Sequence, residues 1–231
     1  MEFGRVGRVV LTDDEPVVRR ALRTSVESTG EFHVVAEAGD GHEAVEAVRA
    51  HLPDVLLLDL RMPGLDGVET TAALRAPESD AAEAAAHIVL MTGFGLDADV
   101  ERALALGADA FLRKDTPREE LLAALRSVRD GDAVLSPEAL RQVLEGLSAP
   151  AAAWSRRVRE RLDLLPPREA EVLGLVAEGL SNREIGERLG TAHDAVRDLV
   201  GRTLAELGAA NRLQLALLAR TAGPGTAGPA R

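Results

Sequence analysis

Short apolar runs alternate with longer amphipathic stretches over the first 130 residues of the chain. Runs of four or five mostly apolar residues fit strands that are buried on both faces of a sheet, and helical spacing of apolar residues follows each run. The pattern therefore predicts five strand–helix units that build a parallel sheet covered by helices on both faces. The predicted strands lie at residues 8–12, 34–37, 55–58, 88–91 and 110–113.

Beyond residue 130 the strand pattern stops and only helical patterns remain. Ser136-Pro137-Glu138 combines a cap residue, a Pro and an acid, which predicts a helix that runs to about Leu147. A small-residue connection follows at 149–153. We accordingly expect one domain over residues 1–130, a helix and linker over 131–160, a helical domain over 161–222 and a disordered, Gly-Pro-containing tail over 223–231.

The helical domain carries the pattern of two short helices joined by a tight turn. Ser181, with Glu184 three residues later, predicts a capping box at the start of one helix. The turn at 190–192 contains a Gly and leads to a second helix at 195–207, and a last helix is expected over 212–219. These dimensions are typical of a helix-turn-helix, in which the second helix enters the major groove of DNA.

The charge differs between the two parts of the chain. Residues 1–154 hold 15 Lys/Arg and 28 Asp/Glu, a net charge of −13, whereas residues 155–231 hold 12 and 10, a net charge of +2. An acidic part joined to a near-neutral, Arg-rich part fits a regulatory module attached to a domain that approaches phosphate. The lack of Cys excludes disulfides and thiolate metal sites. No apolar run approaches the ~18 residues of a membrane span, so we expect a cytoplasmic protein with no membrane partner.

Polar residues follow the predicted strands at their carboxyl ends. Asp13 and Asp14 follow the first strand, Asp59 the third, Thr92 the fourth and Lys114 the fifth. The carboxyl ends of parallel strands meet at one edge, where the ligands of open α/β sheets bind. Three neighbouring carboxylates repel one another unless a cation lies among them, and an all-oxygen donor set favours Mg²⁺. Lys114 is the only Lys among 27 basic residues, at a position where a compact ammonium would contact phosphate.

The same segments resemble the receiver domain of two-component response regulators. The likeness rests on residues 9–16 (VVLTDDEP) and 58–67 (LDLRMPGLDG), with support from 91–93 and 112–115, and it covers about residues 6–130. It implies an α/β domain with a flavodoxin-like, doubly wound sheet of five parallel strands in the order 2-1-3-4-5.

The resemblance implies a role for each polar residue at this edge. Asp59 would accept a phosphoryl group from a histidine kinase. Thr92 and Lys114 would hold the phosphoryl oxygens, and Phe111 would act with Thr92 as a switch. Mg²⁺ would be bound by three carboxylates and one backbone carbonyl, those of Asp13, Asp14, Asp59 and Arg61.

Residues 164–218 resemble the LuxR-type helix-turn-helix of the NarL/FixJ response regulators, an all-α domain of four helices. Segments 165–173 and 179–189 carry this likeness. Pro166 and Ala192 stand where the family usually has capping residues, so we expect Thr191 to cap the second helix instead.

The recognition helix departs from the family in the residues that meet DNA. Asp198 places a negative charge where a neutral hydroxyl is usual, and Leu199 removes a polar reader. Arg197 and Val200 are expected to face the groove near the start of the helix. The full set of expected DNA contacts is Arg183, Ala195, Arg197, Asp198, Val200 and Arg202.

The sequence favours a transcriptional regulator of a two-component system that is not an enzyme. A cognate histidine kinase would phosphorylate Asp59, and a homodimer would then bind double-stranded promoter DNA. Two alternatives stay open: a DNA-binding regulator that does not depend on phosphorylation, and a receiver-based interaction module with weakened DNA binding. An enzyme on the same sheet is a more distant alternative, because a fold does not define a function and Asp59 is the only nucleophile that stands out.

Overall fold

The computed structural model describes residues 5–76, 86–93, 98–132 and 160–221. These residues form two compact units, one within residues 1–129 and the other within 130–231, and we describe each by itself. The helix expected over 136–147, the connection at 149–153 and the tail from residue 223 lie outside the described residues.

The first unit is built on a five-stranded parallel sheet. The strands are paired in the order β2-β1-β3-β4-β5, which confirms the predicted topology. The inner strands β1, β3 and β4 are almost wholly buried, as solid apolar runs require. Their bounds are β1 Gly7–Thr12, β2 Phe32–Ala38, β3 Val55–Asp59, β4 His87–Thr92 and β5 Ala110–Arg113.

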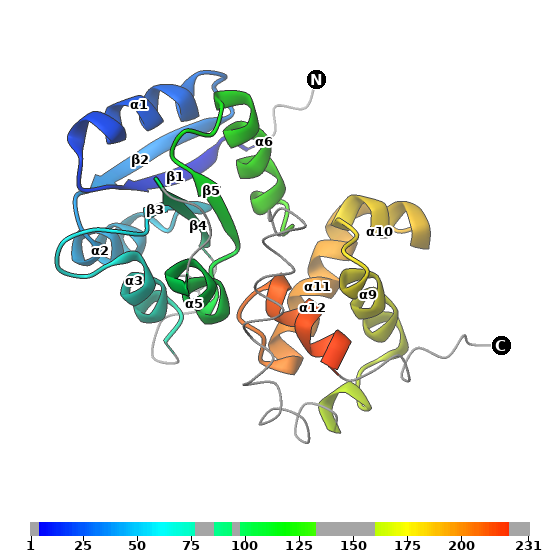
Figure 1. Cartoon of the computed structure of the whole chain (residues 1–231). Coiled ribbons are helices and arrows are strands. Elements are labelled where there is room, and N and C mark those ends of the chain that lie inside the picture. The colour runs from blue at the N-terminus through cyan, green and yellow to red at the C-terminus, as the bar shows by residue number, and fades with distance from the viewer. Residues whose placement is uncertain (1–4, 77–85, 94–97, 133–159, 222–231) are drawn as a thin grey trace. The chain divides into compact units, whose positions relative to one another are not determined.

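Helices cover both faces of this sheet. Figure 1 shows α1 and α6 against one face and α2, α3 and α5 against the other, and each group packs side by side. This arrangement leaves the carboxyl ends of the strands at one edge, with the loops that follow them. The bounds are α1 Pro16–Glu27, α2 Gly41–His51, α3 Gly67–Leu74, α5 Ala98–Leu106 and α6 Arg118–Arg129.

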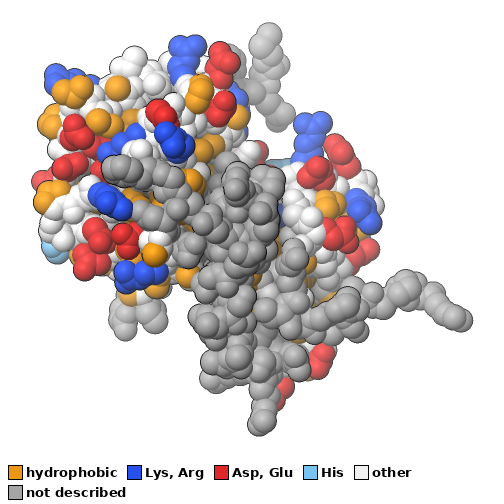
Figure 2. All heavy atoms as spheres, in the orientation of Figure 1, with side chains coloured by type: hydrophobic (Ala, Val, Ile, Leu, Met, Phe, Trp, Pro, Cys, Tyr) orange, Lys and Arg blue, Asp and Glu red, His pale blue; other side chains and the backbone are white. Residues whose placement is uncertain are grey.

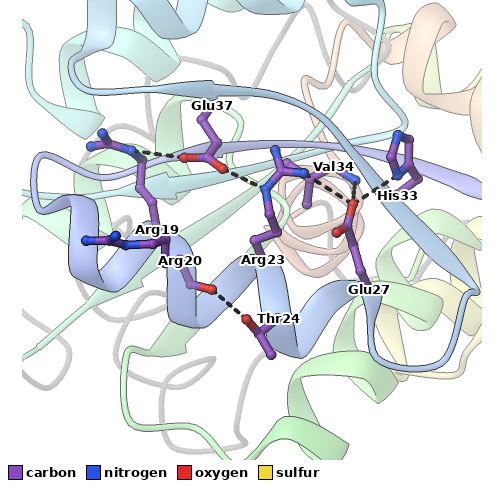
Figure 3. Close-up of polar contacts among 8 residues, drawn as sticks. All are labelled: Arg19, Arg20, Arg23, Thr24, Glu27, His33, Val34 and Glu37. Carbon is purple, nitrogen blue, oxygen red and sulfur yellow. Dashed lines mark hydrogen bonds and ion pairs between the residues drawn. The ribbon is translucent and has the colours of Figure 1, made fainter.

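A ladder of alternating charges joins α1 to the edge strand β2 (Figure 3). Arg19 and Arg23 both extend from α1 toward Glu37 on β2, with nitrogen–oxygen distances of 3.4 and 2.7 Å. Glu27 lies within 2.9 Å of the His33 Nδ1 atom at the other end of the ladder. The guanidinium of Arg23 is the first cause that holds the pKa of Glu37 below its usual range. The ladder therefore fixes α1 along the length of β2.

A buried ion pair ties α3 to the opposite edge of the sheet. The Arg75 guanidinium lies 3.1 Å from the Asp109 carboxylate and also donates to the backbone carbonyls of Ala86 and Gly107. Asp109 in turn accepts from the backbone N–H of Ile88 at 2.8 Å. Burial opposes the charged form of Asp109, but His87, Arg75 and the Ile88 N–H outweigh it and lower the pKa of that carboxyl.

We expect Arg75→Met to lower the free energy of unfolding by about 3 to 5 kcal/mol at pH 7, because it leaves Asp109 buried without its guanidinium partner. Since the pKa of Asp109 is lowered in the folded protein, the stability that its ionised form supplies is present at neutral pH and is lost as the pH falls through that pKa. The difference between variant and wild type should therefore shrink in acid. Urea unfolding at several pH values measures this, with Arg102→Met, which removes an exposed pair with Asp99, as the control. Equal losses in the two variants would contradict the prediction.

In the second unit, the described residues include four helices, which pack around one apolar core. Val172, Ile185, Val196 and Leu215, one from each helix, are fully buried in that core. The predicted capping box is confirmed: Ser181 accepts from the Glu184 backbone N–H, and the Glu184 carboxylate accepts from Ser181. Among the described residues, no helix combines the length and apolar character needed to cross a membrane. The helices are α9 Pro167–Ala177, α10 Asn182–Leu189, α11 His193–Leu207 and α12 Arg212–Thr221.

Candidate functional site

The sheet brings the predicted polar residues to one edge. Asp13 and Asp14 directly follow β1, Asp59 is the last residue of β3, and Thr92 is the last residue of β4. Lys114 directly follows β5, and its backbone N–H donates to the Thr92 carbonyl at 2.8 Å. Parallel pairing therefore places these five residues together, although they span about a hundred positions of sequence.

Three carboxylates converge at this edge. One oxygen from each of Asp13, Asp14 and Asp59 lies within 4.8 Å of the other two. Asp13 and Asp59 are only 1% and 3% exposed, whereas Asp14 is exposed to solvent. The site therefore pairs two buried acids with one that solvent reaches.

The Lys114 ammonium lies between the two buried acids. Its Nζ atom is 2.7 Å from Asp13 Oδ2 and 2.8 Å from Asp59 Oδ2. Burial opposes the charged ammonium, but the close carboxylates of Asp13 and Asp59 outweigh it and raise the pKa of Lys114. Burial also raises the pKa of Asp59, and Lys114 offsets only part of this rise. Asp59 is thus a carboxylate whose charge depends on a neighbouring cation.

The backbone around Asp13 is held by groups that the sequence analysis did not identify. Asp13 Oδ1 accepts from the Glu15 N–H at 2.9 Å, and the Asp13 carbonyl accepts from Arg19 Nη1 at 2.5 Å. Arg19 also pairs with Glu37, so one side chain links the acidic edge to β2. The sequence signal for Arg19 is that it is a basic residue in the first turns of α1, shortly after the paired acids Asp13 and Asp14.

The first residue of α3 packs closely against the backbone of Asp59. Asp66 and Glu69 form a capping box that starts α3 at Gly67. A Cβ atom at Gly67 would lie 2.6 Å from the Asp59 carbonyl oxygen, so only Gly lets the helix start this close. The Asp59 carboxylate also accepts from the Arg61 N–H at 3.3 Å. Both features fall in the segment that carried the resemblance.

The remaining predicted residues of this edge are Thr92, Phe111 and Arg61. Thr92 is 2% exposed at the end of β4. Phe111 is half-buried inside β5, where it pairs in register with Leu90. Arg61 is exposed two residues after Asp59.

The exposed face of α11 carries most of the residues expected at DNA. Ala195, Arg197, Asp198 and Arg202 are exposed on this helix, and Arg183 is exposed on α10. Each of these positions is therefore accessible to a binding partner of the helix-turn-helix.

Two of the predictions for α11 are wrong. Val200 was expected at the groove, but it is 3% exposed and packs in the core of the domain. Leu199 was expected to replace a polar residue that contacts DNA, but it is 8% exposed and belongs to the same core. Its position therefore does not face DNA. The physical reason is helical spacing: Val196, Val200 and Leu207 lie on one face, and that face is buried against the rest of the domain.

The expected cap of α11 is also wrong. The N-cap position is Ala192, and no side chain caps the helix there. The Thr191 hydroxyl donates instead to the Leu189 carbonyl at 3.2 Å.

The arginines on this surface are each paired with a carboxylate. Arg197 lies 3.3 Å from Asp194, Arg183 3.1 Å from Glu187 and Arg202 3.1 Å from Glu169. On the face that Figure 2 shows, basic and acidic side chains of the described residues are interspersed in the same way. The surface therefore presents paired charges instead of a uniform basic patch.

Glu169 was missed in the sequence analysis. It is 5% exposed on α9, and its Oε2 atom has no hydrogen-bond partner among the residues that the structure describes. Burial, and then the charge of Glu169, raise the pKa of Glu206 on α11. The sequence does contain a signal for Glu169: this acid is at helical spacing from Val172, Leu173 and Val176, which places it on the apolar face of α9.

Two family models match the chain. The response regulator receiver domain matches residues 9–126, and the luxR family of bacterial regulatory proteins matches residues 163–219. The two matches contain the acidic edge of the sheet and the helix-turn-helix, respectively.

Two relatives align with this chain over nearly their whole length. The nitrate/nitrite response regulator protein NarL of Escherichia coli strain K12 is 35% identical over 210 residues, which cover 90% of this chain and 93% of NarL. The transcriptional regulatory protein LiaR of Bacillus subtilis strain 168 is 33% identical over 215 residues, which cover 92% of this chain and 96% of LiaR. A crystal structure of a LuxR-family two-component response regulator from Aurantimonas sp. SI85-9A1 matches with a TM-score of 0.54 and 31% identity, over 61% of this chain and 97% of that one. The chain therefore belongs to the NarL-type two-component response regulators, with a receiver domain followed by a LuxR-type DNA-binding domain.

Proposed function

We propose that Asp59 accepts a phosphoryl group from the phosphohistidine of a sensor kinase. The observation that carries this proposal is the buried Asp59 carboxylate, 2.8 Å from the Lys114 ammonium and within 4.8 Å of two further acids. In the transfer, an Asp59 oxygen forms a bond to phosphorus while the bond between phosphorus and the histidine nitrogen breaks. Lys114 stabilises the charge on the phosphoryl oxygens, and the Thr92 hydroxyl donates to one of them.

The acidic edge also fits the Mg²⁺ that receiver domains bind. Its donor set consists of carboxylate oxygens, with no His or Cys, which is the chemistry that Mg²⁺ prefers. Asp13, Asp14, Asp59 and the backbone carbonyl of Arg61 would hold it. The ion would neutralise charge between the acids and the incoming phosphoryl group. Asp13 is already fixed by Glu15 and Lys114, so the protein orders part of this donor set by itself.

Phosphorylation would act through the switch residues to control assembly. The added group brings about −1.5 to −2 charges and three acceptor oxygens, which draw Thr92 toward it and change the position of Phe111. We propose that residues 1–130 act in this way as the receiver and that the active form is a homodimer. Light scattering with and without a phosphoryl mimic tests the dimer, and a monomer in both states, with DNA also present, would rule it out.

We further propose that the helix-turn-helix at 161–222 binds double-stranded promoter DNA through the exposed residues of α10 and α11. Two such helices in a symmetric dimer would read half-sites about one helical turn apart, near 34 Å. The paired charges of Arg183, Arg197 and Arg202 support weaker sequence-independent binding than a free basic surface would give, because each carboxylate opposes contact with phosphate. This observation also favours the second candidate, an interaction module with weakened DNA binding.

The variant Asp198→Thr separates two roles for the exposed acid on α11. If Asp198 only repels phosphate, we expect the variant to bind arbitrary duplexes more tightly, with a change of about one unit or less in the slope of log affinity against log salt. If Asp198 accepts from a cytosine amino group, the variant should lose about 1 to 3 kcal/mol at the cognate site alone. Fluorescence anisotropy on cognate and random duplexes distinguishes these results.

The interaction module is tested in the same assay. Wild type with a phosphoryl mimic, at low salt, is presented with a random duplex library. If it binds none of the sequences in the library, the proposal of DNA binding is rejected in favour of the interaction module.

A further inference from the structure

A side chain from α9 holds the turn between α10 and α11. Arg168 Nη2 donates to the Thr191 hydroxyl oxygen and, at 3.2 Å, to the Leu189 carbonyl. The Thr191 hydroxyl donates to the same carbonyl at 3.2 Å. We call these three hydrogen-bonded residues the turn clamp.

The turn clamp supplies hydrogen-bond donors at the C-terminal end of α10. Leu189 is the last residue of α10, and the carbonyls of a last helical turn lack donors within the helix. A cation there also complements the negative end of the helix dipole. Gly186 lets the turn lie against α10, because a Cβ atom at this position would come within 2.7 Å of the Thr191 carbonyl oxygen.

The helix that follows has no cap of its own. Ala192 occupies the N-cap position of α11 without a side-chain hydrogen bond. Asp194 supplies an acid in the first turn, but its carboxylate lies 3.3 Å from the Arg197 guanidinium. The start of α11 is therefore positioned by the turn before it, and that turn is held by Arg168 together with the hydrogen bond from the Thr191 N–H to the Gly186 carbonyl at 2.9 Å.

We propose that Arg168 is a positioning residue for DNA reading: through the turn clamp it fixes the N-terminal turns of α11 and so the placement of the exposed side chains of that helix. The consequence for DNA rests on the DNA binding proposed above, whereas the clamp is a property of the folded domain alone. Arg168 needs no contact with DNA to act in this way. Its Nη1 atom donates a hydrogen bond to Glu171 at 2.8 Å, and its Nη2 atom donates to the Leu189 carbonyl and the Thr191 hydroxyl.

Amide hydrogen exchange of the full-length protein tests the clamp. Arg168→Met and Thr191→Val should each speed exchange at residues 196 and 197 about five- to tenfold, because Val196 carries the first amide of α11 that is bonded within the helix and the start of an uncapped helix frays. Arg188→Met is the matched control: it removes the same charge from the last turn of α10, where Arg188 pairs with Glu178 at 3.5 Å outside the clamp. Ala192→Ser in the Arg168→Met background should restore slow exchange by supplying a cap. Equal exchange in Arg168→Met and Arg188→Met would overturn the clamp.

Duplex binding tests the role in reading. For a duplex selected by wild type from a random library, the ratio of cognate to random affinity should fall about tenfold in Arg168→Met. Arg188→Met should weaken both affinities alike, as loss of a distant charge does. The same ratio in the two variants would refute the reading role even if exchange changes. If wild type selects no duplex, the proposed DNA binding and the reading role both fail, and the exchange result still decides the clamp.

Discussion

Asp59→Ala should abolish phosphate uptake. We expect wild-type protein, incubated with a small phosphodonor and Mg²⁺, to gain the mass of one phosphoryl group in intact-mass spectrometry. The variant should gain none, because Asp13 and Asp14, the other two acids of the cluster, are proposed only as ligands of Mg²⁺ and not as phosphoryl acceptors. Chelating the divalent cation should also prevent the gain in wild type, since the clustered acids would then lack their countercharge.

The control for this experiment is Asp115→Ala. Asp115 directly follows Lys114 in sequence, but its carboxylate is exposed and lies 2.7 Å from Arg113. This variant should take up phosphate like wild type. Equal phosphate gain in Asp59→Ala and wild type would refute the assignment of the phosphoryl acceptor.

Lys114→Met should have the largest effect on the electrostatics of the site. It leaves Asp13 and Asp59 buried without the ammonium that lies 2.7 and 2.8 Å from them, so we expect the free energy of unfolding at pH 7 to fall by about 3 kcal/mol. The pKa of Asp59 is raised in the folded protein by burial, so its ionised form costs stability as the pH rises through that pKa. Removing Lys114 raises this pKa further. The deficit of the variant should therefore shrink as the pH is lowered from 7.

Urea unfolding with and without Mg²⁺ measures this effect. The ion should stabilise Lys114→Met more than wild type, because it no longer competes with the ammonium for the acids. Arg113→Met is the control, since Arg113 is an exposed neighbour that pairs with Asp115. A deficit that does not change with pH would contradict a role for Lys114 as the counter-ion of Asp59.

Most of the receiver fold could be predicted because its strands are solid apolar runs. Such runs mark buried parallel strands by themselves, and the acids at their ends then converge for topological reasons. The pairs Arg19–Glu37 and Arg75–Asp109 could not be predicted in the same way. Their residues are 18 and 34 positions apart, respectively. No local sequence pattern indicates which polar side chains meet across such a separation.

The helix-turn-helix shows where the sequence was misinterpreted. Val200 was expected at the groove beside Arg197, but it lies four residues after Val196, on the same face of the helix, and the structure buries both. Arg168 lies in a segment that carried the resemblance and Thr191 was expected as a cap, but their hydrogen bonds could not be predicted, because they join α9 to a turn about twenty positions away.

The most direct test of phosphorylation-controlled DNA binding is a selection from a random duplex library, performed with wild type and Asp59→Ala, each with and without the phosphodonor. We expect one sequence family to be enriched by phosphorylated wild type alone. Equal enrichment in all four conditions would show that DNA binding does not depend on phosphorylation of Asp59, and enrichment in none would contradict DNA binding itself.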